Sequence, residues 1–354
     1  MRYEFETEFI ADPRISLIPD VAYSPDGSRI AATYCDLDEV KILDARSHQE
    51  LRTYRNPQAR LDAPHGLVLT DRHLIVSNKL CPADRPSIFT VYDLHSHSRQ
   101  PVFELTTPRS DLCEAHSLAL NGNRLVATYA GRGLGALACY YFEHSTGHMS
   151  GLQSLSADWF REYGQPKGAA FNGAGDKLAV SFTTVKFVPS TLTEKWKRGR
   201  WLLRQKRGAH RFATAIRSRL KRSLRPNSGK AITNGLAVFG IDGHGNISET
   251  PLQFLLEPQY CRLENVHIVD DTCAVADTIN NRVMLYRFDG DRLAEEPFQI
   301  IGEHLSHPHD ACLSPDGRTL LVSNYGIKSS QQNLLWHEQT DVRGDKLSVF
   351  ELRG

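Results

Sequence analysis

The sequence predicts a single all-β domain, a closed β-propeller of six blades. Three observations support this prediction. One strand–turn–strand pattern occurs six times, the copies follow one another at intervals of about 50 residues outside the fourth, and the chain begins with a strand pattern that has no other partner. Length alone would allow two or three domains, but a closed propeller can use all 354 residues as one.

Each copy has a polar residue, a short apolar strand, a tight turn and a second apolar strand. The copies cover 19–34, 63–78, 114–129, 165–182, 263–277 and 307–324. The Ser-Pro-Asp-Gly sequences at 24–27 and 314–317 place Pro and Gly where a hairpin turn needs fixed and permissive φ angles. A third strand is predicted in each copy, at 39–44, 88–93, 137–142, 236–241, 283–288 and 347–352.

The two ends of the chain are expected to share a blade. The last copy stops at Gly354 without a fourth strand, whereas residues 3–10 alternate in polarity with a period of two. This N-terminal strand would complete the last blade, close the ring and remove an exposed sheet edge. The predicted organisation is therefore one propeller over 1–354, with an insertion at 186–231 in the fourth blade.

Several classes of protein are excluded by motifs that the sequence lacks. It has no run of 18 apolar residues, and residues 1–10 lack the basic start and apolar core of a signal peptide, so we expect a cytoplasmic protein. The seven Cys residues are scattered and form no CxxC pair, which excludes zinc-ribbon and thioredoxin motifs. Nucleotide-binding glycine loops, GxSxG and HExxH are absent as well.

One blade carries a more specific motif. The residues from 275 to 286 read Val-Ala-Asp-Thr-Ile-Asn-Asn-Arg-Val-Met-Leu-Tyr and resemble an NHL repeat. The Ser-Pro-Asp-Gly turns and the Ser-Asn-Tyr-Gly sequence at 323–326 resemble the lactonase and YncE-like propellers. Several similar six-bladed families hold a metal at one end of the channel, with carboxylates and Asn in gluconolactonase-like enzymes and with His in the peptide-amidating lyase domain. Neither full motif is present, so no catalytic residue is transferred from these families.

The working face can be located from the repeat. In a propeller the first strand of each blade lines the central channel, so the residues just before it face one end of that channel. Aligning the copies places Pro19, His65, His116, Lys167, Glu264 and His309 at this position. The ends of the second strands bring Tyr34, Asn78, Tyr129, Phe182, Asp277 and Asn324 to the same face.

The chemistry of these side chains predicts a divalent metal, with zinc, calcium, iron and manganese as candidates. Its predicted ligands are His65, His116, His309 and Glu264. Lys167 would pair with an anionic group, and Glu264 or Asp277 would serve as the base. Tyr34, Asn78, Tyr129 and Asn324 are the predicted substrate contacts.

A structural interpretation competes with this functional one. A polar residue before a first strand often only bonds backbone at a blade junction, although three His at the same repeat position favour a site. Asp277 and Arg282 can hold strands together in NHL-like blades.

The insertion is strongly basic. Residues 194–230 contain 14 Lys or Arg and one acidic residue, whereas the rest of the chain contains 28 basic and 40 acidic residues. Apolar residues recur there at helical spacing, at Ala209, Phe212, Ala213, Ile216, Leu220 and Leu224, which predicts a basic amphipathic helix. We expect 195–225 to act as a lid or to contact an anionic membrane surface, which would make the protein peripheral at the membrane. Nucleic-acid binding ranks third.

Two functional hypotheses follow. The first is a metal-assisted hydrolase or lyase that acts on a small anionic substrate at the mouth of the channel. The second is a non-catalytic interaction module that docks on a membrane or a partner through the basic helix. Bound metal in stoichiometric amount would distinguish the two.

Overall fold

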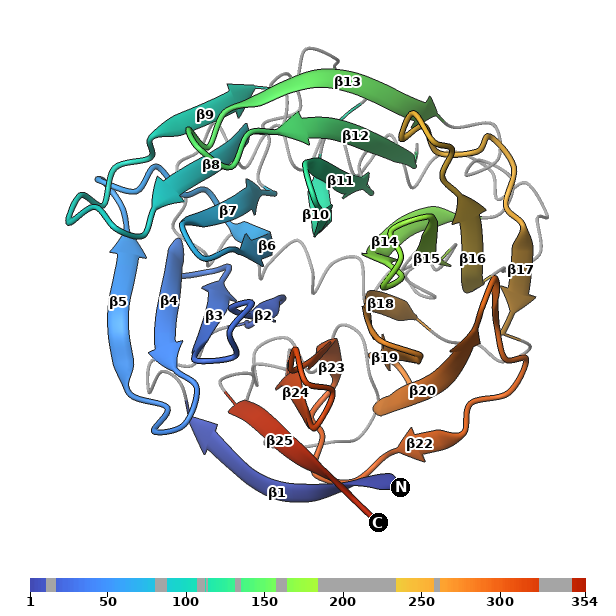
Figure 1. Ribbon diagram of the computed structural model, residues 1–354. Helices are drawn as coiled ribbons and strands as arrows, with labels where there is room; N and C mark the ends of the chain where they lie inside the picture. Colours follow the sequence, from blue (N-terminus) through green and yellow to red (C-terminus); the bar gives the residue numbers. More distant parts are fainter. Residues whose placement is uncertain are drawn as a thin grey trace, which may run out of the picture.

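The computed structural model describes residues 1–10, 17–79, 88–106, 112, 114–130, 135–156, 164–183, 234–257, 262–324 and 346–354. Within these ranges the chain is all β, and its strands form six antiparallel sheets arranged as blades around a central channel (Figure 1). The predicted six-bladed propeller is confirmed. In this part of the chain no helix is long and apolar enough to cross a membrane.

The blades follow one another in sequence order. Blade 1 consists of β2 (Val21–Tyr23), β3 (Arg29–Tyr34), β4 (Glu39–Asp44) and β5 (Glu50–Arg55). Blade 2 consists of β6 (Pro64–Leu69), β7 (His73–Asn78), β8 (Ile88–Asp93) and β9 (Phe103–Thr106). Blade 3 consists of β10 (Ala115–Asn121), β11 (Arg124–Tyr129), β12 (Ala136–Phe142) and β13 (Met149–Ser156).

The remaining blades repeat this order. Blade 4 consists of β14 (Gln165–Phe171), β15 (Lys177–Thr183), β16 (Asn234–Gly240) and β17 (Gln253–Leu256). Blade 5 consists of β18 (Leu263–Val269), β19 (Thr272–Asp277), β20 (Arg282–Asp289) and β22 (Gln299–Ile301), with the short β21 (Arg292–Leu293) also paired to β20. Blade 6 consists of β23 (Pro308–Leu313), β24 (Thr319–Asn324), β25 (Lys346–Arg353) and β1 (Arg2–Ile10).

Blade 6 joins the two ends of the chain, as predicted. β1 pairs with β25 in antiparallel register, with Tyr3 opposite Leu352 and Phe9 opposite Leu347. The Tyr3 hydroxyl donates a hydrogen bond to the Gly317 carbonyl at 2.5 Å, which ties the N-terminal strand to the β23–β24 turn. The ring is thus closed by hydrogen bonds and packing between the first and last residues.

The hydrophobic core is divided among the interfaces between blades. Phe89 of blade 2 packs with Tyr129 and Phe142 of blade 3, and Val266 and Met284 of blade 5 pack in a cluster with blade 4. Burial of each large apolar side chain contributes about 1.5–3 kcal/mol. Because the apolar side chains fill these interfaces, stability does not depend on an apolar channel, and the channel can carry polar groups.

The basic segment is not covered by this description. Residues 186–231, with the predicted amphipathic helix, lie outside the described residues. A lid, a membrane contact or a partner site at 195–225 therefore stays a prediction.

Candidate metal centre

The residues predicted to face one end of the channel, Pro19, His65, His116, Lys167, Glu264 and His309, are called the ring positions below. Five of the six coincide with an irregularity of the first strands. In five blades the register between the first and second strands shifts, at Pro64/Leu67, Ala115/Leu118, Pro166/Ala169, Leu263/Val266 and Pro308/Asp310. The residues that the regular ladder skips include His65, His116, Lys167, Glu264 and His309. A β-bulge leaves its residue unpaired and redirects the side chain, so the repeat itself turns these five side chains away from the regular sheet pattern.

Hydroxyl groups of the second strands stabilise the bulges. The Ser77 hydroxyl accepts a hydrogen bond from the Gly66 amide at 2.9 Å, and the Thr128 hydroxyl accepts one from the Ser117 amide at 3.0 Å. The Thr128 hydroxyl also donates to the Lys167 carbonyl of the next blade at 2.7 Å. Sequence reasoning missed these groups, although a Ser or Thr directly precedes the last residue in five of the six repeat copies.

Glycine follows two of the ring positions because the first strands approach closely. A Cβ atom on Gly66 would lie 2.8 Å from the Ser117 Cα, and one on Gly168 would lie 2.6 Å from the Asn265 Cα. Either approach is closer than real Cβ contacts allow. The neighbouring ring residues are therefore held together by backbone packing as well as by their own hydrogen bonds.

Each ring histidine bonds to the backbone of the following blade. Nδ1 of His65 lies 2.7 Å from the carbonyl of His116, Nδ1 of His116 lies 3.1 Å from the carbonyl of Lys167, and Nδ1 of His309 lies 2.7 Å from the carbonyl of Pro19. A carbonyl can only accept, so each Nδ1 carries the proton and each Nε2 of a neutral ring carries the lone pair. Metal-binding His residues are oriented by outer hydrogen bonds of this kind.

The three histidines converge although they come from blades 2, 3 and 6. The ligand atoms of His65, His116 and His309 all lie within 4.8 Å of one another. Their side chains are 0%, 0% and 1% exposed. Burial lowers the pKa of His65 and His116 well below the usual 6.5 and that of His309 to about 4, so all three rings are neutral at pH 7. The arrangement therefore offers three imidazole lone pairs to one point.

Glu264 completes the cluster. Its Oε2 lies 3.2 Å from Nε2 of His116 and 3.6 Å from Nε2 of His309, and its Oε1 is bound by Nε of Arg262. Burial alone would raise the pKa of Glu264, but its neighbours, Arg262 first and then His309 and Lys167, hold it well below its usual range. An ionised carboxylate thus faces the lone pair of a neutral imidazole across 3.2 Å. Two acceptors at this separation repel each other unless a proton or a metal cation lies between them.

Lys167 lies at the ring position of blade 4. Its side chain is half-buried, and burial lowers the pKa of its amine to about 8, although the charge of Glu264 opposes this shift. In the described ranges its ammonium group makes no hydrogen bond or ion pair. The structure thus brings Lys167 beside the four predicted ligands.

Asp277 lies in a different network. Its carboxylate accepts hydrogen bonds from Nε of Arg282 at 2.9 Å and from the Arg262 amide at 3.1 Å, and Arg282 also contacts Glu257 at 3.3 Å. Each of these contacts joins a donor to an acceptor. The geometry corresponds to the strand-joining interpretation of Asp277, and its role as a base stays a prediction.

The four predicted substrate contacts are buried within the blades. Oδ1 of Asn78 accepts from the Asp62 amide at 2.9 Å, and Oδ1 of Asn324 accepts from the Ser306 amide at 2.7 Å. The Tyr129 hydroxyl lies 2.8 Å from the Tyr140 hydroxyl. Tyr34 is 0% exposed. These contacts serve the packing of the blades, and substrate binding by the four residues stays a prediction.

Two further carboxylates, which sequence reasoning missed, follow ring positions directly. Asp20 accepts a hydrogen bond from the Leu67 amide of blade 2 at 2.8 Å, and Asp310 accepts one from the Val21 amide of blade 1 at 3.1 Å. Burial raises the pKa of both groups, and the charge of Asp310 adds to the rise at Asp20. Through these two hydrogen bonds the pair links blades 6, 1 and 2.

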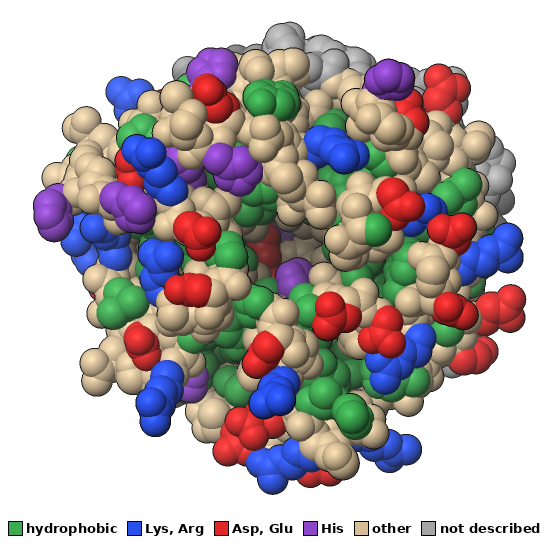
Figure 2. Space-filling model, in the orientation of Figure 1, with side chains coloured by type: hydrophobic (Ala, Val, Ile, Leu, Met, Phe, Trp, Pro, Cys, Tyr) green, Lys and Arg blue, Asp and Glu red, His purple; other side chains and the backbone are tan. Residues whose placement is uncertain are grey.

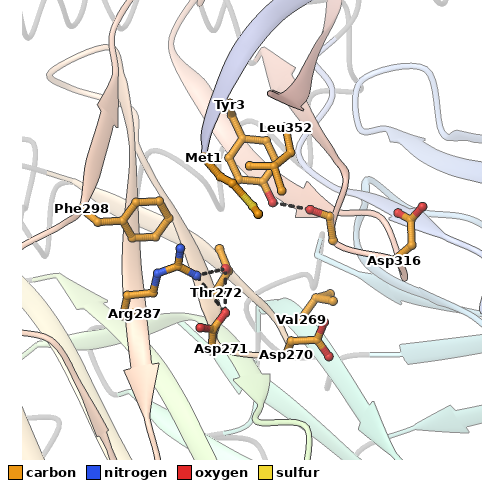
Figure 3. A pocket seen from close by; sticks show the side chains of 11 residues that line it. Met1, Tyr3, Val269, Asp270, Asp271, Thr272, Arg287, Phe298, Asp316 and Leu352 are labelled. Atoms are coloured by element: carbon orange, nitrogen blue, oxygen red, sulfur yellow. Dashed lines mark hydrogen bonds and ion pairs between the residues drawn. The ribbon is translucent and has the colours of Figure 1, made fainter. Parts of the chain in front are cut away.

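Viewed along the channel, the surface is hollowed at its centre, where acidic and histidine side chains are visible (Figure 2). A separate cavity of about 180 Å³ lies between blades 5 and 6, at the turns that end β18 and β23 (Figure 3). Arg287 lines this cavity, but its guanidinium bonds Asp271 at 2.9 Å and lies over the ring of Phe298. None of the residues lining the cavity belongs to the ring, so it is a different place from the candidate metal centre.

Comparisons with known proteins support the fold. The sequence matches no protein-family model and no curated protein sequence. Regucalcin of Agrobacterium tumefaciens, described as a calcium-binding protein, has a similar structure, with a TM-score of 0.58, 14% identity, and coverage of 98% of this chain and 93% of its own. Hydrazine synthase of Kuenenia stuttgartiensis has a TM-score of 0.55 at 15% identity, over 86% of this chain and 80% of its own. The β-propeller domain of Cps50 (Swd1) from Myceliophteria thermophila has a TM-score of 0.51 at 10% identity, over 99% and 100%. At these identities the likeness shows that the chain is a β-propeller.

Proposed function

We propose that this propeller is a metal-dependent hydrolase or lyase for a small anionic substrate. His65, His116 and His309 hold the metal, and Glu264 is the fourth ligand. One observation carries the proposal: three buried imidazoles, each with its proton held on Nδ1 by a carbonyl, gather within 4.8 Å of one another, and two of them place Nε2 at 3.2 and 3.6 Å from the Glu264 carboxylate. A divalent cation at this point removes the repulsion between the acceptors.

The donor set favours some metals over others. Imidazole nitrogen suits zinc, iron and manganese better than calcium, which takes six to eight oxygen ligands. The regucalcin that shares the fold is described as calcium-binding, but three of the four groups here are nitrogens. Because zinc–nitrogen bonds are about 2.0–2.1 Å long, the three histidines, whose ligand atoms lie within 4.8 Å of one another, would draw together to hold zinc.

The side chains around the metal have distinct roles. The metal supplies a Lewis acid that polarises a substrate oxygen or activates water. Glu264 binds protons weakly, because its pKa lies well below the usual range, so it acts as a ligand that stabilises positive charge. Arg262 positions it through the contact with Oε1. Lys167, with a pKa of about 8, can exchange a proton near neutral pH or bind an anionic group of the substrate.

Elemental analysis tests the metal centre. Wild-type protein, His65→Gln, His116→Gln and His309→Gln are loaded with zinc, iron(II) or manganese and freed of excess metal, and metal content is measured by plasma mass spectrometry. His73→Gln is the matched control, since His73 is also buried but lies at the other end of β7. We expect one equivalent in wild type and control, and affinity lower by roughly 10- to 100-fold or more in each ring variant.

Equal metal content in the ring variants and the control would overturn the proposal, as would wild-type protein that binds none of the three metals. Loaded wild-type protein is then screened with lactones, esters and lyase substrates, with chelator-treated protein as the blank. Turnover that persists after complete metal removal would contradict a metal-dependent reaction.

A further inference from the structure

A second lysine lies at the mouth of the channel beside the candidate metal centre. Lys79 directly follows the last residue of β7, and its amide donates a hydrogen bond to the Ala63 carbonyl at 3.1 Å. Ala63 precedes His65 by two residues. This hydrogen bond therefore holds the backbone of Lys79 next to the residues that lead into His65.

The charges of Lys79 and Lys167 both act on His116. The positive charge of Lys79 lowers the pKa of His65, His116 and His309, and that of Lys167 lowers the pKa of His116. The charge of Lys79 also acts on Lys167 itself. Two ammonium groups from blades 2 and 4 are therefore close enough to influence one cluster of imidazoles.

Neither ammonium group has an anionic partner in the part of the chain that the structure describes, although both side chains are half-buried. Two other cations differ from them: Arg262 binds Glu264, and Lys177 binds Asp176 at 2.7 Å and Asp291 at 2.9 Å. A cation that is partly removed from water is stabilised by an anion or by hydrogen-bond acceptors. Lys79 and Lys167 can therefore accept an anion that the described part of the chain does not supply to them.

The balance of charge at the mouth favours an incoming anion. The charged groups that act most strongly on the ring and on Lys167 are three cations, Lys79, Lys167 and Arg262, and two carboxylates, Glu264 and Glu114. A divalent metal would add two positive charges. Outside 194–230 the chain contains 28 basic and 40 acidic residues, so this local excess of positive charge runs against the rest of the protein and attracts anions to the channel.

We propose that Lys79 and Lys167 form an anion subsite, which binds the acidic group of the substrate while another substrate oxygen lies at the metal. The shared chemistry of the ligand is a group of acidic oxygens, either carboxylate or phosphate. The charge balance selects a dianion, such as a dicarboxylate or a phosphate monoester, over a monocarboxylate. This inference deepens the proposed function and rests on it for the placement of the second oxygen.

Binding of simple anions tests the subsite. Inorganic phosphate, malonate and acetate are titrated calorimetrically into metal-loaded and metal-free protein, for wild type, Lys79→Met, Lys167→Met and the double variant. Methionine keeps the length of the side chain and removes the charge. Lys177→Met is the matched control, since Lys177 is paired with carboxylates at the other end of blade 4. The metal content of every sample is measured alongside.

We expect phosphate and malonate to bind wild type and Lys177→Met at least tenfold more tightly than either single variant, with acetate the weakest of the three anions. Raising the salt concentration should weaken binding to wild type more than binding to the double variant. The stronger of phosphate and malonate identifies the acid group. Unchanged metal content in the Lys variants separates this subsite from the metal centre.

Three results would overturn the inference: wild type binds none of the anions, the Lys variants bind them as wild type does, or Lys177→Met weakens binding equally. These results differ from failure of the proposed function. A protein without metal that still binds malonate or phosphate through Lys79 and Lys167 would retain the subsite and lose the metal. If the metal-loaded protein binds anions equally well with and without the two lysines, the metal centre would stand and the anion subsite would be refuted.

Discussion

Blade 5 contains two buried carboxylates with opposite surroundings. Asp277 of β19 accepts only from donors: Nε of Arg282, the Arg262 amide and Nδ2 of Asn280 at 2.7 Å. Glu264 of β18 accepts from Arg262 on one side but faces imidazole lone pairs on the other. The first network is complete within the protein, and the second would be completed by a proton or, as proposed, by a metal cation. A buried carboxylate therefore indicates a functional site when acceptors face it, and a structural role when hydrogen-bond donors surround it.

Arg262 connects the two carboxylates. Its backbone amide bonds Asp277, and its guanidinium binds Glu264. The hydrogen bonds of Asp277 thus hold Arg262 in place, and Arg262 in turn positions Glu264. Blade 5 supplies a rigid support for a site that would be unfavourable without its ligand.

The largest expected effect separates the two carboxylates by stability. Asp277→Asn removes the more deeply buried of the two carboxylates that pair with the Arg282 guanidinium and leaves only Glu257, so we expect the free energy of unfolding to fall by about 3 kcal/mol. Urea denaturation measures this, with Asp289→Asn, an exposed carboxylate at the end of β20, as the control within about 0.5 kcal/mol. The folded variant should still bind one equivalent of metal. A loss of metal at unchanged stability would make Asp277 part of the site.

The pH dependence of stability distinguishes the clusters next. His309 and His267 have pKa values of about 4, below the usual 6.5, so the unfolded chain takes up protons between pH 6.5 and 4 that the folded protein does not. Stability of the metal-free protein is therefore complete above pH 6.5 and is lost as the pH falls toward 4. The loss amounts to as much as roughly 3 kcal/mol for each group.

Denaturation at pH 7, 5.5 and 4.5 measures this loss. His267→Gln and His309→Gln should flatten the profile, whereas Asp277→Asn should lower it without changing its slope. Stability that rises as the pH falls below 6.5 would mean that the histidines are protonated against Glu264 in the folded protein. The repulsion on which the metal proposal depends would then be absent.

The smallest expected change in stability belongs to Glu264→Gln. In the metal-free protein the new amide can donate to Nε2 of His116, which offsets the weakened contact with the partly exposed Arg262. We expect the free energy of unfolding to change by less than about 1 kcal/mol and metal affinity to fall roughly 10- to 100-fold. A loss of stability as large as that of Asp277→Asn would assign Glu264 to the structural class as well.

Much of the site follows from the repeat. Aligning the copies placed His65, His116, His309 and Glu264 at one blade position, and the structure brings their side chains together. The same alignment placed Asp277 and the ends of the second strands on this face, but not the direction of their side chains. Asn78 and Asn324 accept hydrogen bonds from the backbone amides of Asp62 and Ser306. A position in a strand predicts how far along the channel a residue lies, but it does not predict which group its side chain contacts.

Other members of the site gave no sequence signal. Lys79 and Arg262 lie just outside the repeated strands, and their relation to the ring appears only when neighbouring blades are in place. The partners of Asp20 and Asp310 are amides of the following blade, at Leu67 and Val21. No local pattern specifies such contacts, since they depend on how closely two blades pack.

The amino-acid sequence by itself determined the number of blades, the closure by the N-terminal strand and the face on which the polar ring lies. A repeat achieves this because equal spacing along the chain becomes equal angular spacing around an axis. Only the tertiary structure decided that residues 65, 116 and 309 meet, which nitrogen of each imidazole carries the proton and which carboxylate lies beside them. Closure brings distant residues to one axis, and burial there excludes the water that would otherwise set their protonation.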